Sequence, residues 1–115
     1  MSDCIFCRIV AGEIPATLVS RSEDAVAFHD VNPQAPTHVL VVPVRHYLNA
    51  AAADSEEGER VLGRLLRFAV AVARQLGLAE GGYRLVLNNG KDGGQSVDHL
   101  HVHVLGGRRM QWPPG

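Results

Sequence analysis

The sequence predicts an α+β domain in which an antiparallel β-sheet packs against one long helix. Segments with the two-residue period or the β-branched composition of strands stand on both sides of one long segment with a helical period. Strands and helices do not alternate along the chain, which favours an antiparallel sheet over a parallel one. The 115 residues are enough for one domain, which we expect to span residues 1–115.

The first part of the chain is predicted to form a short helix or turn and then three strands. The opening segment CIFCRIVAGEIP should end its helix or turn near Gly12. Two short strands are expected over about residues 17–21 and 24–29, with the polar pair Glu23 and Asp24 at the turn between them. A proline-containing loop, NPQAP, leads to the buried, β-branched strand THVLVVP.

The longest predicted element is a helix that starts near Asp54 and stops at Gly77. Asp54 and Glu57 have the Asp-x-x-Glu spacing of a helix start, and glycine directly after the last apolar position is a stop signal. About 22 residues at 1.5 Å each give a length of roughly 33 Å. Apolar residues recur at steps of three and four, which predicts one buried stripe: Val61, Leu62, Leu65, Leu66, Phe68, Ala69, Val72, Ala73 and Leu76.

Two further strands, YRLVLNN and HLHVHVLG, are expected after the helix, and a glycine-rich loop, GKDGGQS, joins them. The tail GRRMQWPPG contains prolines that prevent regular structure.

Charge and composition exclude several classes of protein. The formal net charge is −1, so there is no basic footprint for nucleic acid or for an anionic membrane surface. No apolar run approaches the roughly 20 residues that span a bilayer. The N-terminus lacks the basic region and apolar core of a secretory signal, so we expect a cytoplasmic protein whose two cysteines are thiols or metal ligands.

Three histidines at alternate positions of the last strand are the main candidates for chemistry. His99, His101 and His103 should share one face of the strand at a spacing of roughly 6.5–7 Å. A solvated polar stripe would mix several residue types, so three histidines indicate a site. The residues between them should point into the core: Leu100, Val102 and Val104.

The histidine row is compatible with two kinds of chemistry. Two histidines separated by one residue can both bind zinc. Alternatively, a neutral imidazole can attack phosphorus, and a neighbouring histidine can act as a general acid. The preceding loop, with Gly90, Gly93, Gly94 and Ser96, is either a plain connection or a cradle for phosphate oxygens.

The segment HLHVHVL resembles the signature of the histidine-triad (HIT) family of nucleotide hydrolases and transferases. CIFCRIVAGEIP, AFHDVNPQAPTHVLVVP, NNGKDGGQSV and VLGGRRMQWPPG are similar, in the family's order, to the Hint branch of nucleoside phosphoramidases. This resemblance covers essentially the whole chain. It implies the HIT fold, an antiparallel sheet of about five strands with one long helix and a short N-terminal helix, and a homodimer with a continuous ten-stranded sheet.

The resemblance also implies roles for the histidines. His101 would attack the α-phosphorus and form a nucleotidyl-histidine intermediate, while the carbonyl of His99 holds its other ring nitrogen. His103 would contact the phosphate, and His38 would complete the family's set or serve only as a structural histidine. Ser96 would donate to the leaving nitrogen or to a phosphate oxygen.

The nucleotide contacts implied by the resemblance come from three further segments. The base and ribose would be held by FHDV, with Asp30 accepting from the ribose, and the phosphate and leaving group by the glycine-rich loop. The tail would either reach the partner's active site or act as a packing plug. These residues are Phe28, His29, Asp30 and Val31, then Asn88, Gly94, Gln95 and Ser96, and finally Trp112. Asp98 departs from the family pattern, and its charge could raise the pKa of His99 or His103.

Cys4 and Cys7 form a C-x-x-C motif, which in a cytosolic chain indicates zinc or redox chemistry. The resemblance implies a structural zinc site completed by His46 and His99. The alternative is two reduced thiols without a metal.

The function implied is hydrolysis of P–N bonds in purine nucleoside phosphoramidates (AMP-NH2 or AMP-lysine type) and related adenylates, with no catalytic cofactor. The partners implied are a purine nucleotide (AMP or GMP type) and a second copy of the chain, without nucleic acid or membrane. Alternatives are a dinucleoside polyphosphate hydrolase, a non-catalytic nucleotide-binding regulatory or scaffold protein, and an enzyme with catalytic zinc.

Overall fold

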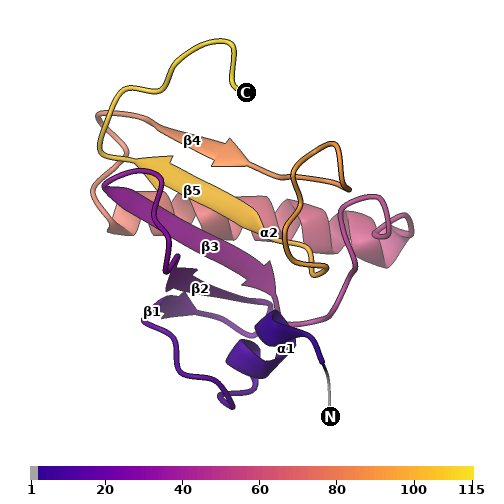
Figure 1. The fold of residues 1–115 in the computed structure, drawn as a ribbon. Helices are drawn as coiled ribbons and strands as arrows, with labels where there is room; N and C mark the ends of the chain where they lie inside the picture. Colours follow the sequence, from indigo (N-terminus) through magenta and orange to yellow (C-terminus); the bar gives the residue numbers. More distant parts are fainter. Residues whose placement is uncertain (1–2) are drawn as a thin grey trace.

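Five antiparallel strands form one sheet in the computed structural model, which describes residues 3–115 (Figure 1). The strand order across the sheet is β1-β2-β3-β5-β4, so the last strand in the sequence lies inside the sheet. This confirms the predicted α+β class. The elements are α1 (Ile5–Val10), β1 (Leu18–Arg21), β2 (Ala25–His29), β3 (Thr37–Pro43), α2 (Glu56–Gln75), β4 (Tyr83–Val86) and β5 (Val102–Gly106).

The sheet separates two apolar clusters, one on each face. Side chains of β3 alternate between them, with Val39 and Val41 facing α2 and Leu40 and Val42 facing α1. Because β3 is covered on both faces, six of its seven residues are buried, which explains its continuous apolar sequence. The predicted helix stripe supplies four of the twelve buried residues in the cluster on the α2 face, Leu65, Ala69, Val72 and Ala73. Leu66 was also placed in the stripe but is 41% exposed.

The ends of α2 differ slightly from the predicted ones. Ser55 is the N-cap, and its hydroxyl accepts a hydrogen bond from the Gly58 amide at 3.0 Å, so the predicted Asp54–Glu57 start was wrong by one residue. The helix has 20 residues, and Gly77 follows it with φ of +77°, as the stop signal predicted. No helix within residues 3–115 is long and apolar enough to cross a membrane.

The last strand begins three residues later than predicted, at Val102. Residue 102 pairs with Val41, so in this register residues 101, 100 and 99 would lie opposite Val42, Pro43 and Val44. Proline has no amide hydrogen to offer, and the Leu100 amide instead donates to the Tyr47 carbonyl at 2.7 Å. Residues 99–101 therefore keep the alternation of side chains without belonging to the ladder.

Two glycines of α2 should respond in opposite ways to replacement by alanine. A Cβ at Gly58 would lie 2.5–2.7 Å from backbone atoms of Ala53, whereas a Cβ at Gly63 would meet nothing within 4 Å. We expect Gly58→Ala to lower the free energy of unfolding by about 1–3 kcal/mol. Gly63→Ala should raise it by about 0.4–1 kcal/mol, because it restricts the unfolded chain. Urea unfolding of both variants measures this, and equal effects of the same sign would contradict it.

Candidate functional site

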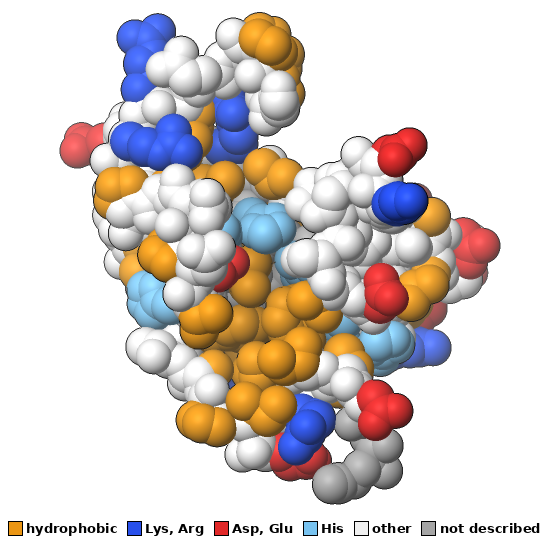
Figure 2. Space-filling model, viewed as in Figure 1, with side chains coloured by type: hydrophobic (Ala, Val, Ile, Leu, Met, Phe, Trp, Pro, Cys, Tyr) orange, Lys and Arg blue, Asp and Glu red, His pale blue; other side chains and the backbone are white. Residues whose placement is uncertain are grey.

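A cavity of about 640 Å³ opens on the face of the sheet that carries α1. In Figure 2 apolar side chains gather in the hollow at the centre of this face, and histidines lie along its margins. The volume falls within the range of small-molecule sites, and the lining is mostly apolar with a few polar groups. His101, His103 and Ser96 are among those polar groups.

His101 is held by its own backbone neighbour. Its ring is buried, and Nδ1 lies 2.7 Å from the carbonyl oxygen of His99. A carbonyl oxygen can only accept, so Nδ1 carries the hydrogen and Nε2 of the neutral ring keeps its lone pair. Because the side chain lines the cavity, this arrangement presents a nucleophilic nitrogen to any ligand bound there.

A chain of hydrogen bonds fixes the opposite tautomer on His103. The Gln34 amide donates to Nδ1 of His38 at 3.0 Å, so the His38 hydrogen must sit on Nε2. That Nε2 lies 2.9 Å from Nδ1 of His103 and 3.4 Å from a carboxylate oxygen of Asp30. The hydrogen of His103 is then on Nε2, which is buried and has no hydrogen-bond partner within the described chain. The cavity thus contains one ring nitrogen that can attack and one N–H that can donate.

Burial favours the neutral form of three histidine rings, those of His38, His99 and His103. Desolvation, with smaller contributions from His101 and His38, lowers the pKa of His103 from 6.5 to about 4, against the opposing charge of Asp30. Desolvation also lowers the pKa of His38, again opposed by Asp30. Burial lowers the pKa of His99 to about 4. Asp98 is not among the groups that shift the pKa of His99 or His103, and its side chain is exposed, which favours the alternative that it points away from the histidine face.

The glycine-rich loop contributes Ser96 to the cavity wall, and Gln95 braces the loop from within. The Gln95 side chain accepts from the Gly90 amide at 2.8 Å and donates to the carbonyls of Leu48 and Val97 at 2.8 and 3.0 Å. Gly94 has φ of +81°, which disfavours any other residue there. Three residues assigned to nucleotide contacts are not among those that line the cavity: Asn88, Gly94 and Gln95.

All four residues of the FHDV segment line the cavity. One carboxylate oxygen of Asp30 accepts from the Asn32 amide at 2.8 Å, and the other faces His38. Val31 is fully exposed at the rim. Trp112 does not line the cavity of its own chain: it lies in the C-terminal tail with 81% of its surface exposed.

The N-terminal segment forms a wall of the cavity that sequence reasoning missed. Its signal was weak, because an apolar i, i+4 pair such as Ile5 and Ile9 is common in short helices and does not indicate which face of a sheet the helix covers. The missed residues are Ile5, Phe6, Ile9, Ile14, Pro15, Ala16 and Thr17, together with Leu40 and Val97.

Cys4, Cys7, His46 and His99 come together beside α1, as predicted, with their ligand atoms all within 4.8 Å of one another. The S–N distances are 3.3 Å for Cys4–His99, 3.3 Å for Cys7–His46 and 3.5 Å for Cys7–His99. The two Nδ1 atoms of His46 and His99 lie 3.1 Å apart. Tetrahedral zinc with standard bond lengths requires roughly 3.5 Å between S and N and roughly 3.3 Å between two N atoms. The four side chains therefore fit zinc.

The surroundings of His99 also suit a metal ligand. Its Nε2 donates to the Pro43 carbonyl at 3.0 Å, so Nδ1 keeps its lone pair and faces the two thiols. The same residue thus directs its ring to the cysteines and its carbonyl to His101.

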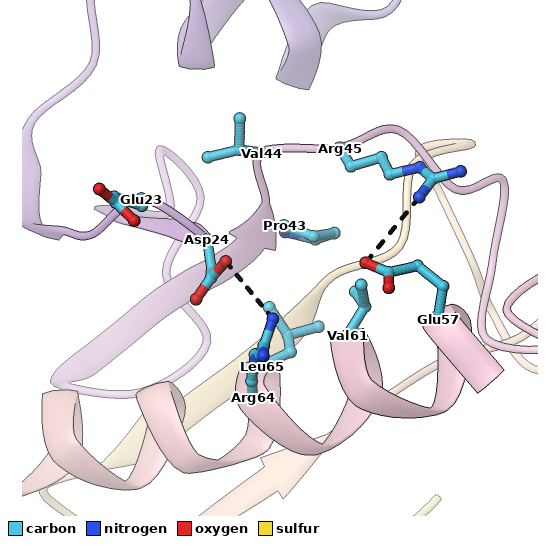
Figure 3. A pocket seen from close by; sticks show the side chains of 9 residues that line it. All are labelled: Glu23, Asp24, Pro43, Val44, Arg45, Glu57, Val61, Arg64 and Leu65. Atoms are coloured by element: carbon cyan, nitrogen blue, oxygen red, sulfur yellow. Dashed lines mark ion pairs between the residues drawn. The ribbon is translucent and has the colours of Figure 1, made fainter.

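A second, smaller hollow lies between the ends of β2 and β3 and the start of α2 (Figure 3). Four of its five charged side chains form ion pairs, Arg64 with Asp24 at 3.9 Å and Arg45 with Glu57 at 4.0 Å, and the fifth is the exposed Glu23. These side chains are well exposed, so the pairs contribute little to stability. They offer no buried, unsatisfied group to a ligand, and this hollow is not a candidate site.

A five-stranded antiparallel sheet that packs against one long helix and presents His101 and His103 to a cavity is the arrangement expected of a histidine-triad protein. The profile of the HIT domain matches residues 11–110. The chain therefore belongs to the HIT domain family, and its resemblance to the Hint branch is confirmed.

Three relatives illustrate this membership. The chain is 52% identical to the "14 kDa zinc-binding protein" of Zea mays, over 99% of this chain and 89% of that protein. It is 49% identical to "Adenylylsulfatase HINT1" of Arabidopsis thaliana, over 99% and 78% of the two chains. The crystal structure of a HIT family hydrolase from Legionella pneumophila Philadelphia 1 superposes with a TM-score of 0.94 at 46% identity, over 98% and 100% of the two chains.

The low pKa of His103 should make the folded protein less stable in mild acid. In the unfolded chain a histidine binds its proton near pH 6.5, whereas folded His103 does so only near about 4. Between these values the unfolded state binds more protons, so the free energy of unfolding should fall as pH is lowered from 6.5 toward 4. Urea unfolding of zinc-saturated protein across this range measures the slope. In His103→Gln the slope should be smaller, and identical slopes in the two proteins would contradict the assignment.

Proposed function

We propose that this hydrolase cleaves the P–N bond of purine nucleoside phosphoramidates, of the AMP-NH2 or AMP-lysine type, and acts on related adenylates. The observation that carries the proposal is the bond from Nδ1 of His101 to the His99 carbonyl, which leaves Nε2 of a neutral ring facing the cavity. An adenylate as substrate is consistent with the name of the Arabidopsis relative, an adenylylsulfatase.

In the first step Nε2 of His101 attacks the α-phosphorus, and the P–N bond to the leaving amine breaks as the new N–P bond forms. The leaving nitrogen takes a proton from Ser96, whose hydroxyl lies at the same cavity. The ring of His101 becomes positively charged in the nucleotidyl-histidine, and the His99 carbonyl stabilises that charge through Nδ1–H. In the second step water attacks phosphorus and gives one proton back to the Ser96 oxygen as the N–P bond breaks, so that neutral His101, the Ser96 hydroxyl and the nucleoside monophosphate result.

His103 stabilises charge on the phosphate. Its ring lines the cavity, and its buried Nε2–H has no hydrogen-bond partner among residues 3–115, so a phosphate oxygen bound beside it would satisfy this donor. His38 and Asp30 hold this hydrogen in place through the chain of bonds that starts at the Gln34 amide. His38 is thereby a positioning residue in this proposal.

The nucleoside occupies the apolar part of the cavity. Phe28 is buried and offers a ring for the base to pack against, while the free side of the Asp30 carboxylate is available to ribose hydroxyls. His29 and Val31 lie exposed at the rim of the same wall. Asn88, Gly94 and Gln95 contribute by shaping the phosphate loop.

Zinc is proposed as a structural ion at Cys4, Cys7, His46 and His99, which would cross-link the N-terminal segment to the sheet. The four-atom geometry supports this, and so does the name of the maize relative, a zinc-binding protein. The reaction requires no metal, because the lone pair of His101 faces the cavity and His38 uses both ring nitrogens in hydrogen bonds.

A cytoplasmic homodimer remains our proposal for the assembled enzyme. β4 is an edge strand in the order β1-β2-β3-β5-β4, so a second copy could extend the sheet to ten strands at that edge. On α2, the apolar side chains of Leu66 and Val70 are 41% and 36% exposed, and a second copy could cover them. The exposed tail with Trp112 would then be able to reach the partner's cavity.

Replacement of the proposed nucleophile should abolish the covalent step. We expect rapidly quenched enzyme with adenosine 5′-phosphoramidate to show a nucleotidyl adduct on His101 by peptide mass spectrometry. His101→Ala should lose the adduct and lower kcat/KM by about 10³-fold or more, as removal of a covalent nucleophile does. Arg67→Ala, on the exposed side of α2, is the matched control. Unchanged turnover in His101→Ala would refute the proposal and leave a nucleotide-binding protein or another active centre.

The choice of bond can be tested with paired substrates. The enzyme should turn over the phosphoramidate with a kcat/KM at least about tenfold above that for a diadenosine polyphosphate. Ser96→Ala should lower phosphoramidate turnover by about 10²-fold or more, since the amine then leaves without its proton donor. A preference for the dinucleotide would instead support the polyphosphate hydrolase alternative.

A further inference from the structure

Helix α1 lies between the candidate zinc cluster and the cavity, and it belongs to both. Cys4 is the N-cap of this helix, and its sulfur accepts from the Cys7 amide at 3.4 Å. Phe6 stands between the two cysteines in sequence and lines the cavity. The cluster and the cavity wall are thus parts of one short segment.

The Phe6 ring touches both histidines that matter for the reaction. Its centroid lies 5.1 Å from that of His101 and 5.9 Å from that of His99, each in an edge-on arrangement. It lies 5.5 Å from Phe28, on the proposed base-binding wall. Only 5% of Phe6 is exposed, so most of its surface packs against these rings and the neighbouring apolar side chains.

The position of α1 depends on what anchors it. A helix of six residues is too short to be stable by itself. Its anchors on the sheet are the packing of Phe6 and Val10, the bond from Arg21 to the Val10 carbonyl at 3.0 Å, and the cysteines. A metal ion bound by Cys4 and Cys7 would add two strong attachments to the end of the helix that carries Phe6.

His99 provides a second connection. Its ring faces the cysteines, and its carbonyl holds Nδ1 of His101 at 2.7 Å. Restraint of the ring by a metal therefore also restrains the carbonyl that orients the nucleophile.

We propose that zinc and nucleotide bind this protein cooperatively, with α1 as the connecting element and Phe6 as its positioning residue. This inference rests on the proposed function for the identity of both ligands. Zinc holds α1 on the sheet, α1 completes the cavity wall, and nucleotide in the cavity in turn stabilises α1. Because the coupling is a difference in binding free energy, each ligand must raise the affinity of the other by the same factor.

The direct test compares the Kd of AMP for zinc-loaded protein and for protein stripped of zinc by a chelator that is then removed, using calorimetry. We expect AMP to bind at least about fivefold more weakly to the stripped protein. Far-UV circular dichroism should show α2 still folded in that protein. A ratio below about fivefold would overturn the proposal, as would loss of the α2 signal, because the effect would then be global unfolding.

The reciprocal measurement is the affinity of the protein for zinc, with and without AMP. Zinc is titrated against a competing chromophoric chelator with and without saturating AMP. The Kd of zinc should fall in the presence of AMP by the same factor by which zinc lowers the Kd of AMP. A zinc Kd that is equal with and without AMP would overturn the coupling.

Two variants of α1 test the role of Phe6. Phe6→Leu removes the ring that touches His99 and His101 but keeps the connection through the His99 carbonyl, so the ratio of AMP affinities with and without zinc should fall well below that of the unmodified protein while zinc still binds. Ile9→Ala is the matched control, because it removes cavity wall from the same helix without an aromatic contact to either histidine. It should weaken AMP binding but keep the ratio. An unchanged ratio in Phe6→Leu would overturn the assignment to Phe6.

These results separate this inference from the proposed function. Zinc-dependent AMP binding without phosphoramidate turnover would keep the coupling and refute the phosphoramidase. Phosphoramidate turnover together with an AMP affinity that does not depend on zinc would support the phosphoramidase and refute the coupling.

Discussion

The hydrogen bond from Nδ1 of His101 to the His99 carbonyl is the constraint on which the site depends. At 2.7 Å, and inside a region where both residues are buried, it decides the tautomer of the central ring without any charged partner. A carboxylate in this place would put a negative charge beside the ring. A carbonyl orients the ring through the same nitrogen without adding that charge. The alternation of His99, Leu100 and His101 provides this geometry, because it directs both rings to one side while Leu100 anchors the backbone in the opposite core.

The two-faced sheet explains how such a small chain can support that geometry. The α2 face contains the larger cluster and contributes the rigidity of β3 and β5, which lie side by side at the centre of the sheet (Figure 1). The α1 face is covered only partly, and the uncovered part is the cavity. Val39 and Val41 pack on the α2 face, whereas Leu40 lies on the α1 face and forms part of the cavity wall. Stability and binding therefore come from opposite sides of the same strands.

The sequence predicted those features that arise from local periodicity or from an extended motif. The apolar stripe around Leu65 and Val72 gave α2, and the alternate histidines gave a common face for the site. Features decided by distant partners could not be read in this way. The start of β5 depends on Pro43, which lacks an amide hydrogen, and on the Tyr47 carbonyl, which takes the Leu100 amide. That Phe6 forms cavity wall depends on which face of the sheet α1 covers, and six residues of helix contain no sign of this.

The separation between metal and reaction also has an electrostatic reason. A zinc ion carries two positive charges, and if it lay beside His101 alone it would draw electron density from the attacking nitrogen and favour loss of its hydrogen. At the cysteine cluster two thiolates would balance that charge, so the field at the nucleophile would be that of a neutral group. His99 permits this arrangement because its ring and its carbonyl point to different sites. An ion held there would stiffen the support of the proposed nucleophile without placing a net charge beside it.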